Sequence, residues 1–384
     1  MTSSSPQPEP PASVPGARAR PRGRLSRYDE QGRFDILCLD REGIVAFVQE
    51  QCGATAGDGV RVYQRLWQRR VTRFEDMHGI RVALRKRLAQ VAFIRRLSAD
   101  LRLESQDGTV KYLWRLDDGH VVESVYIPDD DRVTLCISSQ VGCAMACTFC
   151  LTGDLGLKRN LLASEIALQV MQVQEDQERR ISNIVLMGMG EPLHNLPNLI
   201  PALATCLDDH ALKFSHRKIT VSTVGLVPKM AELAAALPVN LAVSLNATTE
   251  AQRRQIMPIT RRHSMEELLQ ACRDFPMPSG KRITFEYVMF EGFNDSLDDA
   301  ARLLVLLQGI KAKVNLIPYN DNPERDLRRP SEATVKAFQD FLVTRGMSTA
   351  VRTTRGIDIS AACGQLGKTR QQVVDGVVPG PSSP

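Results

Sequence analysis

Short apolar segments alternate with helical segments along the chain after Arg132. The apolar segments are mostly uncharged, as strands buried on both faces are, and the stretches between them have the 3.6-residue period of a helix. The predicted strands are residues 134–138, 183–188, 218–223, 240–245, 282–290 and 313–318, with a last extended piece at 348–354. Six strand–helix units predict an α/β fold with a parallel sheet, whose catalytic groups lie at the carboxyl ends of the strands.

The chain before Arg132 has a different pattern. Three segments between residues 40 and 99 have helical apolar spacing and are separated by the glycine-containing stretch CGATAGDG, which predicts a small helical domain. Residues 109–127 alternate on both sides of Asp118-Gly119, which is typical of a β-hairpin. The expected divisions are a disordered tail at 1–34, a basic helical domain at 35–105, a hairpin linker at 106–132, an α/β domain at 133–367 and a flexible tail at 368–384.

Composition restricts the class of protein. The 384-residue chain has 43% apolar and 24% charged residues, as globular proteins do, and it offers no apolar run long enough to span a membrane. The N-terminal stretch is rich in Pro, Ser, Ala and Arg and lacks the apolar core of a signal peptide. Nine unevenly spaced cysteines favour reduced thiols and metal chemistry over a disulfide framework. We therefore expect a cytoplasmic protein.

Basic residues are concentrated in the helical domain. Twelve Arg and Lys residues lie from Arg61 to Arg102, against three acidic residues. Arg61, Arg65 and Arg69 recur at every fourth position and would form one cationic stripe on a helix, which can follow a phosphate backbone. A solvated helix face is an equally common reason for a basic run. The size of this excess favours RNA or DNA as a partner.

A cluster of cysteines follows the first predicted strand. Cys143, Cys147 and Cys150 form the spacing C-x3-C-x2-C, and Cys136 precedes them by seven residues. Four thiolates would complete a structural zinc site, but zinc ribbons usually separate two C-x2-C pairs. Three thiolates in one loop instead suit a 4Fe-4S cluster that keeps one iron open to a substrate or cofactor.

This spacing, with Phe149 before the last cysteine, resembles the radical S-adenosylmethionine (SAM) superfamily. The resemblance implies a partial (β/α)6 barrel, a 4Fe-4S cluster on the three cysteines, and SAM at the open iron. The segment MGMGEP at 187–192 ends the second predicted strand, where that superfamily has a glycine-rich SAM-binding loop. Its glycines let the backbone approach a ligand, and Glu191 can accept the methionyl ammonium.

Longer segments narrow the resemblance to one family. Between residues 36 and 367 the chain is similar to the RlmN/Cfr RNA adenine methyltransferases, and overall most similar to RlmN. The segments that carry this are VVESVYIPDDDRVTLCISSQVGC, KRNL, MGMGEPL, SLNA, NLIPYN and RTTRGIDISAACGQL. The last places Cys363 after the final strand, at the expected mouth of the barrel. A single Cys among small residues is more often a buried structural residue, but the surrounding pattern favours a functional thiol.

The resemblance implies a radical reaction through a methylated cysteine. Carbon 2 of adenine is electron-poor and has no lone pair to attack a sulfonium methyl. One SAM would methylate Cys363, and a second, cleaved by the cluster, would give a 5′-deoxyadenosyl radical that takes hydrogen from this methyl group. After the carbon radical adds to the base, Glu123 would remove the ring proton and Cys136 would attack the Cys363 sulfur, releasing the RNA and leaving a disulfide. Each turnover uses two SAM molecules.

The resemblance also implies SAM contacts at the ends of the predicted strands. They are Gly190, Glu191, Ser222, Ser244, Leu245, Asn246 and Asn320. Strand-end capping is the alternative role for the Ser and Asn residues. Without the resemblance, Glu123 would be an exposed strand carboxylate, and Cys136 a fourth metal ligand or a core cysteine. The family commonly has His at the position of Asn246, so that contact is altered.

The implied substrate is an adenine of 23S rRNA near the peptidyl-transferase centre, with a tRNA anticodon-loop adenine as a second target. Both are unstacked bases that an enzyme can reach without melting a helix. An electron-donor protein is implied, and we expect a monomer with no membrane partner. The stretches TGDLGLKRNL and RFEDM are more similar to Cfr, so methylation of carbon 8 is an alternative. Other classes are a non-catalytic, zinc-stabilised RNA-binding module and a radical SAM enzyme with a non-RNA substrate.

Overall fold

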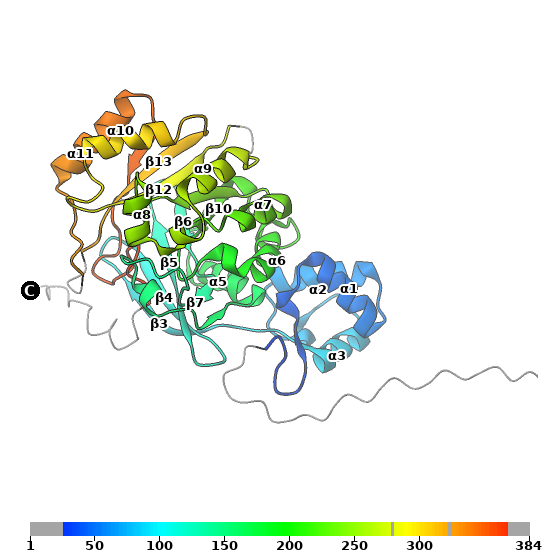
Figure 1. Ribbon diagram of the computed structural model, residues 1–384. Helices are drawn as coiled ribbons and strands as arrows, with labels where there is room; N and C mark the ends of the chain where they lie inside the picture. The colour runs from blue at the N-terminus through cyan, green and yellow to red at the C-terminus, as the bar shows by residue number, and fades with distance from the viewer. Residues whose placement is uncertain (1–25, 278–279, 322–324, 368–384) are drawn as a thin grey trace, which may run out of the picture.

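The computed structural model describes residues 26–277, 280–321 and 325–367 (Figure 1). The predicted tail at 368–384 and most of the tail at 1–34 lie outside the described residues. Within the described ranges, every helix is too short or too polar to cross a lipid bilayer.

One ten-stranded sheet forms the centre of the fold, in the order β14-β13-β12-β11-β10-β9-β6-β5-β4-β3. Its parallel strands are β6 (Val133–Cys136), β9 (Asn183–Leu186), β10 (Ile219–Thr223), β11 (Asn240–Ser244), β12 (Ile283–Met289), β13 (Ala312–Pro318) and β14 (Thr349–Val351). They coincide with the seven segments predicted from the sequence, so the predicted partial barrel is confirmed. Most of them end earlier than predicted, because the last apolar residues leave the sheet to form loops at its carboxyl edge.

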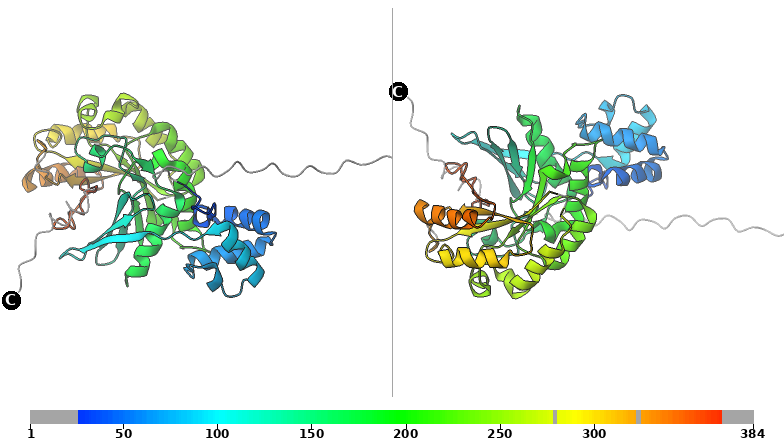
Figure 2. Two further views of the ribbon diagram at one scale, coloured as in Figure 1. Left: turned by 90° about the horizontal axis from the view of Figure 1, so that it is seen from below. Right: turned by 90° about the horizontal axis from the view of Figure 1, so that it is seen from above.

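Helices cover the outer side of the curved sheet (Figure 2). They are α5 (Ala163–Asp176), α6 (Leu196–Leu207), α7 (Val227–Ala236), α8 (Glu250–Ile256), α9 (Met265–Asp274), α10 (Leu297–Leu306) and α11 (Glu332–Thr344), whereas α4 (Leu151–Asp154) lies in the cysteine loop. Capping boxes begin α8, α9 and α10 at Thr249, Ser264 and Ser296, where a side chain satisfies a free backbone N–H group. Residues 163–173 of α5 are all buried, because α5 packs beneath both the sheet and the N-terminal segment.

An antiparallel extension continues the sheet beyond β6. It consists of β3 (Ser98–Glu104), β4 (Val110–Arg115) and β5 (Val121–Pro128). The hairpin of β4 and β5 turns at Asp118-Gly119, where Gly119 has a φ of 85° that favours glycine. β3 lies in the range predicted as helical, so that prediction was wrong there: Ala99, Leu101 and Leu103 alternate with polar residues, as in a strand.

The helical domain packs against the outer side of the barrel near α5 and α6 (Figure 1). It contains β1 (Phe34–Asp35), η1 (Ile36–Cys38), α1 (Arg41–Cys52), α2 (Ala56–Trp67), η2 (Phe74–Asp76), α3 (Val82–Val91) and β2 (Ala92–Phe93). α1 and α2 pack closely at Gly59, where a Cβ would lie 2.7 Å from the Cα of Val45. The close contact requires glycine, although glycine weakens a helix interior.

The predicted cationic stripe on α2 is wrong in part. α2 ends at Trp67, so Arg69 lies beyond the helix. Arg61 pairs with Asp58 at 2.7 Å, and Arg81 pairs with the same carboxylate at 2.9 Å. The Arg61 pair is local, at i,i+3 on α2, so the sequence could have indicated it, whereas Arg81 reaches Asp58 only through the fold.

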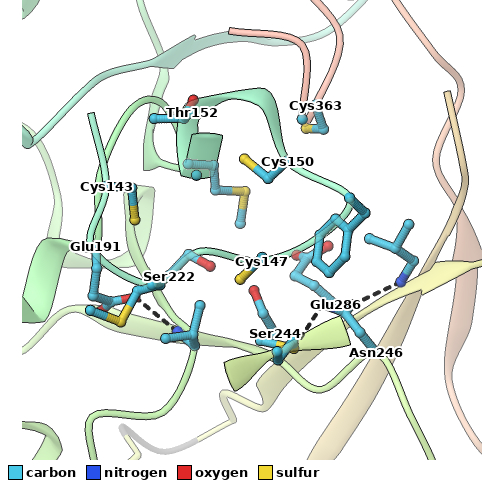
Figure 3. A pocket seen from close by; sticks show the side chains of 18 of the residues that line it. Cys143, Cys147, Cys150, Thr152, Glu191, Ser222, Ser244, Asn246, Glu286 and Cys363 are labelled. Carbon is cyan, nitrogen blue, oxygen red and sulfur yellow. Dashed lines mark hydrogen bonds between the residues drawn. The ribbon is translucent and has the colours of Figure 1, made fainter. Parts of the chain in front are cut away.

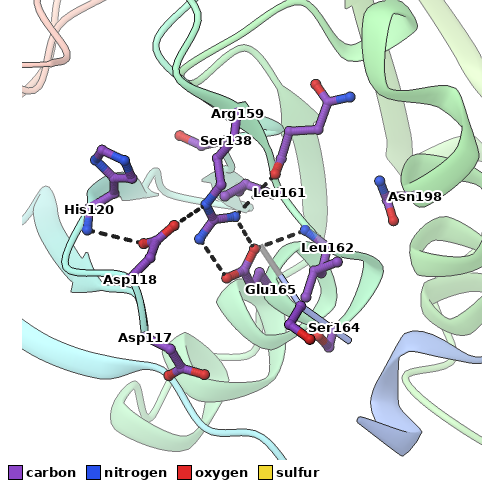
Figure 4. A network of polar contacts seen from close by, with 12 residues as sticks. Asp117, Asp118, His120, Ser138, Arg159, Leu161, Leu162, Ser164, Glu165 and Asn198 are labelled. Atoms are coloured by element: carbon purple, nitrogen blue, oxygen red, sulfur yellow. Dashed lines mark hydrogen bonds and ion pairs between the residues drawn. The ribbon is translucent and has the colours of Figure 1, made fainter. Parts of the chain in front are cut away.

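A buried polar network joins the helical domain, the hairpin turn and the barrel (Figure 4). Arg159 of β8 (Arg159–Asn160) donates hydrogen bonds of 2.7 and 2.9 Å to Glu165 and also pairs with Asp118 of the hairpin turn. Asp35 of the helical domain accepts a hydrogen bond of 2.6 Å from Ser164, beside Glu165. Because β8 pairs with β7 (Gln140–Val141), this network also fixes the start of the cysteine loop.

Candidate active site

A cavity of about 170 Å³ lies at the carboxyl ends of the parallel strands (Figure 3). Its wall combines the ends of β9 to β13 with the cysteine loop and the C-terminal segment. The predicted site residues that line it are Cys143, Cys147, Cys150, Gly190, Glu191, Ser222, Ser244, Asn246, Asn320 and Cys363. The structure therefore brings ten of the thirteen residues together, at the sheet edge where parallel strands place catalytic groups.

The three clustered cysteines face this cavity, and their geometry fits an iron–sulfur cluster better than a single ion. Among the described residues, no three His, Cys, Asp or Glu side chains are arranged to hold one metal ion. A zinc ion needs its thiolates around one point, whereas each cysteine of a 4Fe-4S cluster binds a different iron. Cys136 does not line the cavity, whereas Cys363 does, so the cysteine that the structure places beside the three clustered cysteines is Cys363.

Burial makes these thiols hard to ionise without a bound cation. It raises the pKa of Cys143 to about 12, and it also raises the pKa values of Cys147 and Cys150. Repulsion between Cys147 and its two neighbours adds to the effect on its pKa. A metal centre would supply the positive charge that thiolates at this depth require.

Arg253 of α8 supplies positive charge from below the cavity. It is 1% exposed and donates hydrogen bonds to three carbonyl oxygens, those of Val224, Ser244 and Leu245, at 2.6 to 3.1 Å. Its charge lowers the pKa of Cys147, against the larger effect of burial. Sequence analysis missed this residue, because nothing in the pattern distinguishes it from the exposed Arg254 beside it.

The glycine loop after β9 lies directly against the strand end that precedes the cysteines. Gly190 has a φ of 101°, and a Cβ there would lie 2.5 Å from the Cβ of Gln140. The side chain of Gln140 in turn accepts a hydrogen bond of 2.8 Å from the backbone N–H of Glu191. Glycine is therefore required at this position, both for its backbone conformation and for the close approach.

Glu191 is the buried carboxylate of the cavity. It is 2% exposed, and burial raises its pKa to about 7. Its two oxygens accept hydrogen bonds from the backbone N–H groups of Leu193 (3.1 Å) and Val224 (2.9 Å), which fix the carboxylate in place. An ammonium group in the cavity would favour the ionised form.

Asn246 has a structural role, and asparagine also suits the backbone conformation at this position. Its φ is 58°, a left-handed conformation that Asn tolerates better than most residues. Its side chain accepts a hydrogen bond of 2.9 Å from the N–H of Val288 and donates one of 3.4 Å to the sulfur of Met257. Leu245 beside it is fully buried and does not line the cavity.

The segment that carries Cys363 is fixed to the cavity wall. Asn320 donates a hydrogen bond of 3.2 Å to the carbonyl oxygen of Cys363, and the carbonyl of Gly364 accepts one of 2.9 Å from the N–H of Leu151. Cys363 is half-buried and faces the same space as the cluster cysteines (Figure 3). Cys363 and the three clustered cysteines are far apart in the sequence, but the sheet brings them to the same cavity.

Arg352 interacts electrostatically with Cys136 and Cys363, the two cysteines outside the C-x3-C-x2-C cluster. It lines the cavity, and the charge of Cys363 is the largest influence on its raised pKa, with smaller contributions from Glu286 and Cys136. Cys136 on β6 is 5% exposed, and burial raises its pKa to about 12, while Arg352 acts in the opposite direction. Sequence analysis missed Arg352 as a separate site residue, although it lies within the segment RTTRGIDISAACGQL.

Glu123 is buried, so its alternative role as an exposed strand carboxylate is wrong. It is 1% exposed on β5, and its carboxylate lies 3.5 Å from the Nζ of buried Lys111 on β4. It also accepts a hydrogen bond of 3.0 Å from the backbone N–H of Gly367. Like Cys136, it does not line the cavity itself.

Comparison with known proteins agrees with this geometry. The family model described as the Radical SAM superfamily matches residues 137–304, which include the cysteine loop and the glycine loop. A radical SAM methyltransferase from Sphaerobacter thermophilus has a similar structure, with a TM-score of 0.80 and 37% sequence identity over 86% of this chain and 98% of that chain. Fold and site together define a radical SAM enzyme, a class that uses a 4Fe-4S cluster and SAM.

Curated relatives identify the family within this class. The dual-specificity RNA methyltransferase RlmN of Geotalea uraniireducens is 52% identical over 344 residues, which cover 89% of this chain and 99% of the relative. RlmN of Geobacter sulfurreducens is 53% identical over 306 residues, covering 80% of this chain and 84% of the relative. The chain belongs to the RlmN family. The predicted class of enzyme is therefore confirmed, and a non-catalytic zinc module is not supported.

Proposed function

We propose that this protein methylates carbon 2 of adenine in RNA through a methyl group carried on Cys363. The observation that supports this most directly is the position of Cys363 on the same cavity as the three cluster cysteines and the glycine loop (Figure 3). Cleaving SAM requires no protein thiol beyond the cluster ligands. A methyl carrier, by contrast, has to lie within reach of the radical.

The residues of the cavity divide into those that hold the cofactors and those that position the thiol. Cys143, Cys147 and Cys150 would hold the 4Fe-4S cluster, which together with SAM supplies a 5′-deoxyadenosyl radical when bound. Gly190 and Glu191 would bind the methionine end of SAM, and Ser222, Ser244, Asn246 and Asn320 would complete its contacts, while Leu245, which does not line the cavity, would support Ser244 and Asn246 on either side of it. Asn320 also holds the backbone of Cys363, so it would align the methyl carrier with the cofactor.

Glu123 and Cys136 would act after the methyl carbon has bonded to the base. Glu123 would accept the ring proton, and the adduct would also give up one electron, which the cluster held by Cys143, Cys147 and Cys150 would be able to take up, so that the ring is aromatic again. The thiolate of Cys136 would then form a disulfide with Cys363 as the carbon–sulfur bond breaks, with the electron pair passing to the carbon, which takes a proton. A dithiol reductant would then reduce the disulfide between Cys136 and Cys363 back to two thiols. The two residues lie on neighbouring strands, and Arg352 lies near both thiols, which supports a shared role.

The substrate class and partners follow from the family. The relatives are named dual-specificity RNA methyltransferases, which supports an adenine of 23S rRNA as the main target and a tRNA adenine as a second. The basic helical domain would contribute to RNA binding. We also propose a cytoplasmic monomer served by an electron-donor protein, since radical formation requires one electron from outside the chain.

Nucleoside analysis tests this function. The protein is reconstituted anaerobically with iron and sulfide and incubated with SAM, a reductant and a 23S rRNA transcript, and the digested nucleosides are separated by mass spectrometry. We expect 2-methyladenosine from the wild type and none from Cys363→Ala, although that variant keeps its cluster. Methylation at carbon 8 would assign the Cfr reaction instead, and unmodified RNA would contradict the proposal.

A further inference from the structure

A second cavity lies between the helical domain and the barrel, away from the active site. Its volume is about 610 Å³, and its walls are the end of α2, the end of α5 and the loop after α6. α5 and α6 run antiparallel to the strands, so their ends lie at the amino edge of the sheet, opposite the cysteines. We call this cavity the junction groove, and the residues considered below are Trp67, Arg69, Arg70, Glu178, Arg180 and Lys213.

The junction groove carries uncompensated positive charge. Four of these residues are cationic, and Glu178 is the only acidic side chain among the described residues that line the groove. In the part of the chain that the structure describes, none of the four cations takes part in an ion pair within 4.0 Å. Other arginines of the helical domain are neutralised, as Arg96 is by Glu175. The groove therefore gathers unpaired cations from both the helical domain and the barrel, although Arg65, Arg85, Lys86 and Arg87 elsewhere on the helical domain also have no ion pair among the described residues.

Two of the cations are held in an unfavourable backbone conformation. Arg70 has a φ of 53° and Lys213 a φ of 60°, in the left-handed region that favours glycine. Residues in such conformations lower stability and tend to occur at functional sites. Here the two cations line one groove from different segments, those that follow α2 and α6, at positions where glycine would be the less strained residue.

The groove also has a buried donor without an acceptor. The indole Nε1 of Trp67 has no hydrogen-bond partner among the described residues, and the side chain is 1% exposed. An unsatisfied buried N–H group is rare in folded proteins. Because Trp67 is covered, neither its ring face nor its N–H is exposed to a ligand, so the groove offers the charges of its Arg and Lys side chains rather than a stacking surface.

We propose that the junction groove binds backbone phosphates of the RNA substrate, at a distance from the reacting adenine. This inference rests on the proposed function. Arg and Lys are the side chains that bind phosphate oxygens, and such contacts position an RNA without reading its sequence. The groove would therefore contribute to RNA affinity and leave the chemical step unchanged.

The test removes three exposed cations together, in the variant Arg69→Gln/Arg180→Gln/Lys213→Gln. A matched control, Arg273→Gln/Arg282→Gln/Lys311→Gln, removes three exposed cations elsewhere on the barrel that likewise have no ion pair among the described residues. Binding of the reconstituted enzyme to a full 23S rRNA transcript is measured over a range of salt concentrations. We expect the slope of log Kd against log salt to fall by about 2 to 3 in the groove variant only, because each lost phosphate contact removes about 0.7 to 0.9.

Kinetics separate this role from catalysis. In the groove variant KM for the long transcript should rise about tenfold or more while kcat is unchanged, and KM for a short hairpin around the target adenine should not change. Equal salt slopes for the groove and control variants would overturn the inference, whereas a wild type that methylates no RNA would overturn the proposed function.

A single substitution separates binding from folding. Lys213→Gly relieves the strained backbone while it removes one cation. It should therefore raise the melting temperature and still weaken RNA binding. Tighter or equal RNA binding by this more stable variant would contradict the inference.

Discussion

The backbone N–H of Gly367 donates a hydrogen bond of 3.0 Å to the carboxylate of Glu123. The Nζ of Lys111, 3.5 Å from the same carboxylate, donates one of 3.1 Å to the carbonyl oxygen of Ser360. These contacts hold the segment on both sides of Cys363 against β4 and β5, as the C-terminal segment in Figure 2 shows. Glu123 is thus a support for the methyl carrier as well as the proposed base, and it can meet an adenine only when this segment shifts.

Substitution of Glu123 should separate these two roles. Glu123→Gln keeps an oxygen acceptor for Gly367 but cannot take a proton, so methylation of RNA should fall by about 10² to 10⁴, while methylation of Cys363 persists. Mass spectrometry of the Cys363 peptide and a single-turnover assay measure the two steps.

This variant leaves Lys111 buried without a carboxylate, which lowers stability by about 3 to 5 kcal/mol. Glu123→Gln/Lys111→Met removes both charges and serves as the control for folding. Full RNA methylation by a well-folded Gln variant would exclude Glu123 as the base.

The buried thiol of Cys136 predicts a pH dependence for release of the RNA. Burial raises the pKa of Cys136 to about 12, so the thiol is almost entirely protonated at neutral pH. Below that value, each rise of one pH unit makes the attacking thiolate about tenfold more abundant. Decay of the covalent protein–RNA adduct, followed on denaturing gels, should therefore accelerate from about pH 7 to about pH 9. Cys136→Ala should keep the adduct at every pH, and a flat profile for the wild type would be inconsistent with a thiolate at Cys136.

The close approach of Gly190 to Gln140 predicts a steric effect on SAM binding. Gly190→Ala places a Cβ 2.5 Å from the Cβ of Gln140, so the glycine loop must shift away from the cysteines. SAM affinity should fall by about tenfold or more, since a few ångströms of displacement removes the contacts of the methionine end, while the iron content is unchanged. Gly292→Ala is the control, because Gly292 also has a positive φ of 66° but nothing lies within 4 Å of its Cβ position. Equal SAM affinity of the two variants would show that the contact is not required.

Arg253 predicts an electrostatic effect on the metal centre. Arg253→Met removes a buried positive charge near Cys147, so gaining an electron becomes less favourable and the midpoint potential of the reconstituted cluster should become more negative. Three carbonyl oxygens also lose their donor, which should lower the free energy of unfolding by about 3 kcal/mol or more. Redox titration followed by electron paramagnetic resonance measures the potential. Arg254→Met, at the exposed neighbouring position, should leave both quantities unchanged.

The strands, the three clustered cysteines and the glycine loop could be predicted from the sequence, because each depends on neighbouring residues. Arg253 and Arg352 could not, because their roles come from contacts with distant strand ends. The predicted basic stripe was wrong at Arg69, which lies beyond the end of α2, and Arg61 is paired with Asp58 one turn earlier on the same helix, a local pair that the sequence could have indicated. β3 could also have been predicted, because Ala99, Leu101 and Leu103 alternate with polar residues, but this short alternation was included in the basic helical segment before it.

The most direct test of the methyl carrier uses SAM with a fully deuterated methyl group. If the methyl group passes through Cys363 and loses one hydrogen to the radical, the methyl group of 2-methyladenosine keeps two of the three deuterium atoms, and the third appears in 5′-deoxyadenosine. Direct displacement from SAM would transfer all three. Mass spectrometry of the nucleosides distinguishes these outcomes: two deuterium atoms are predicted, and three would contradict the proposed role of Cys363.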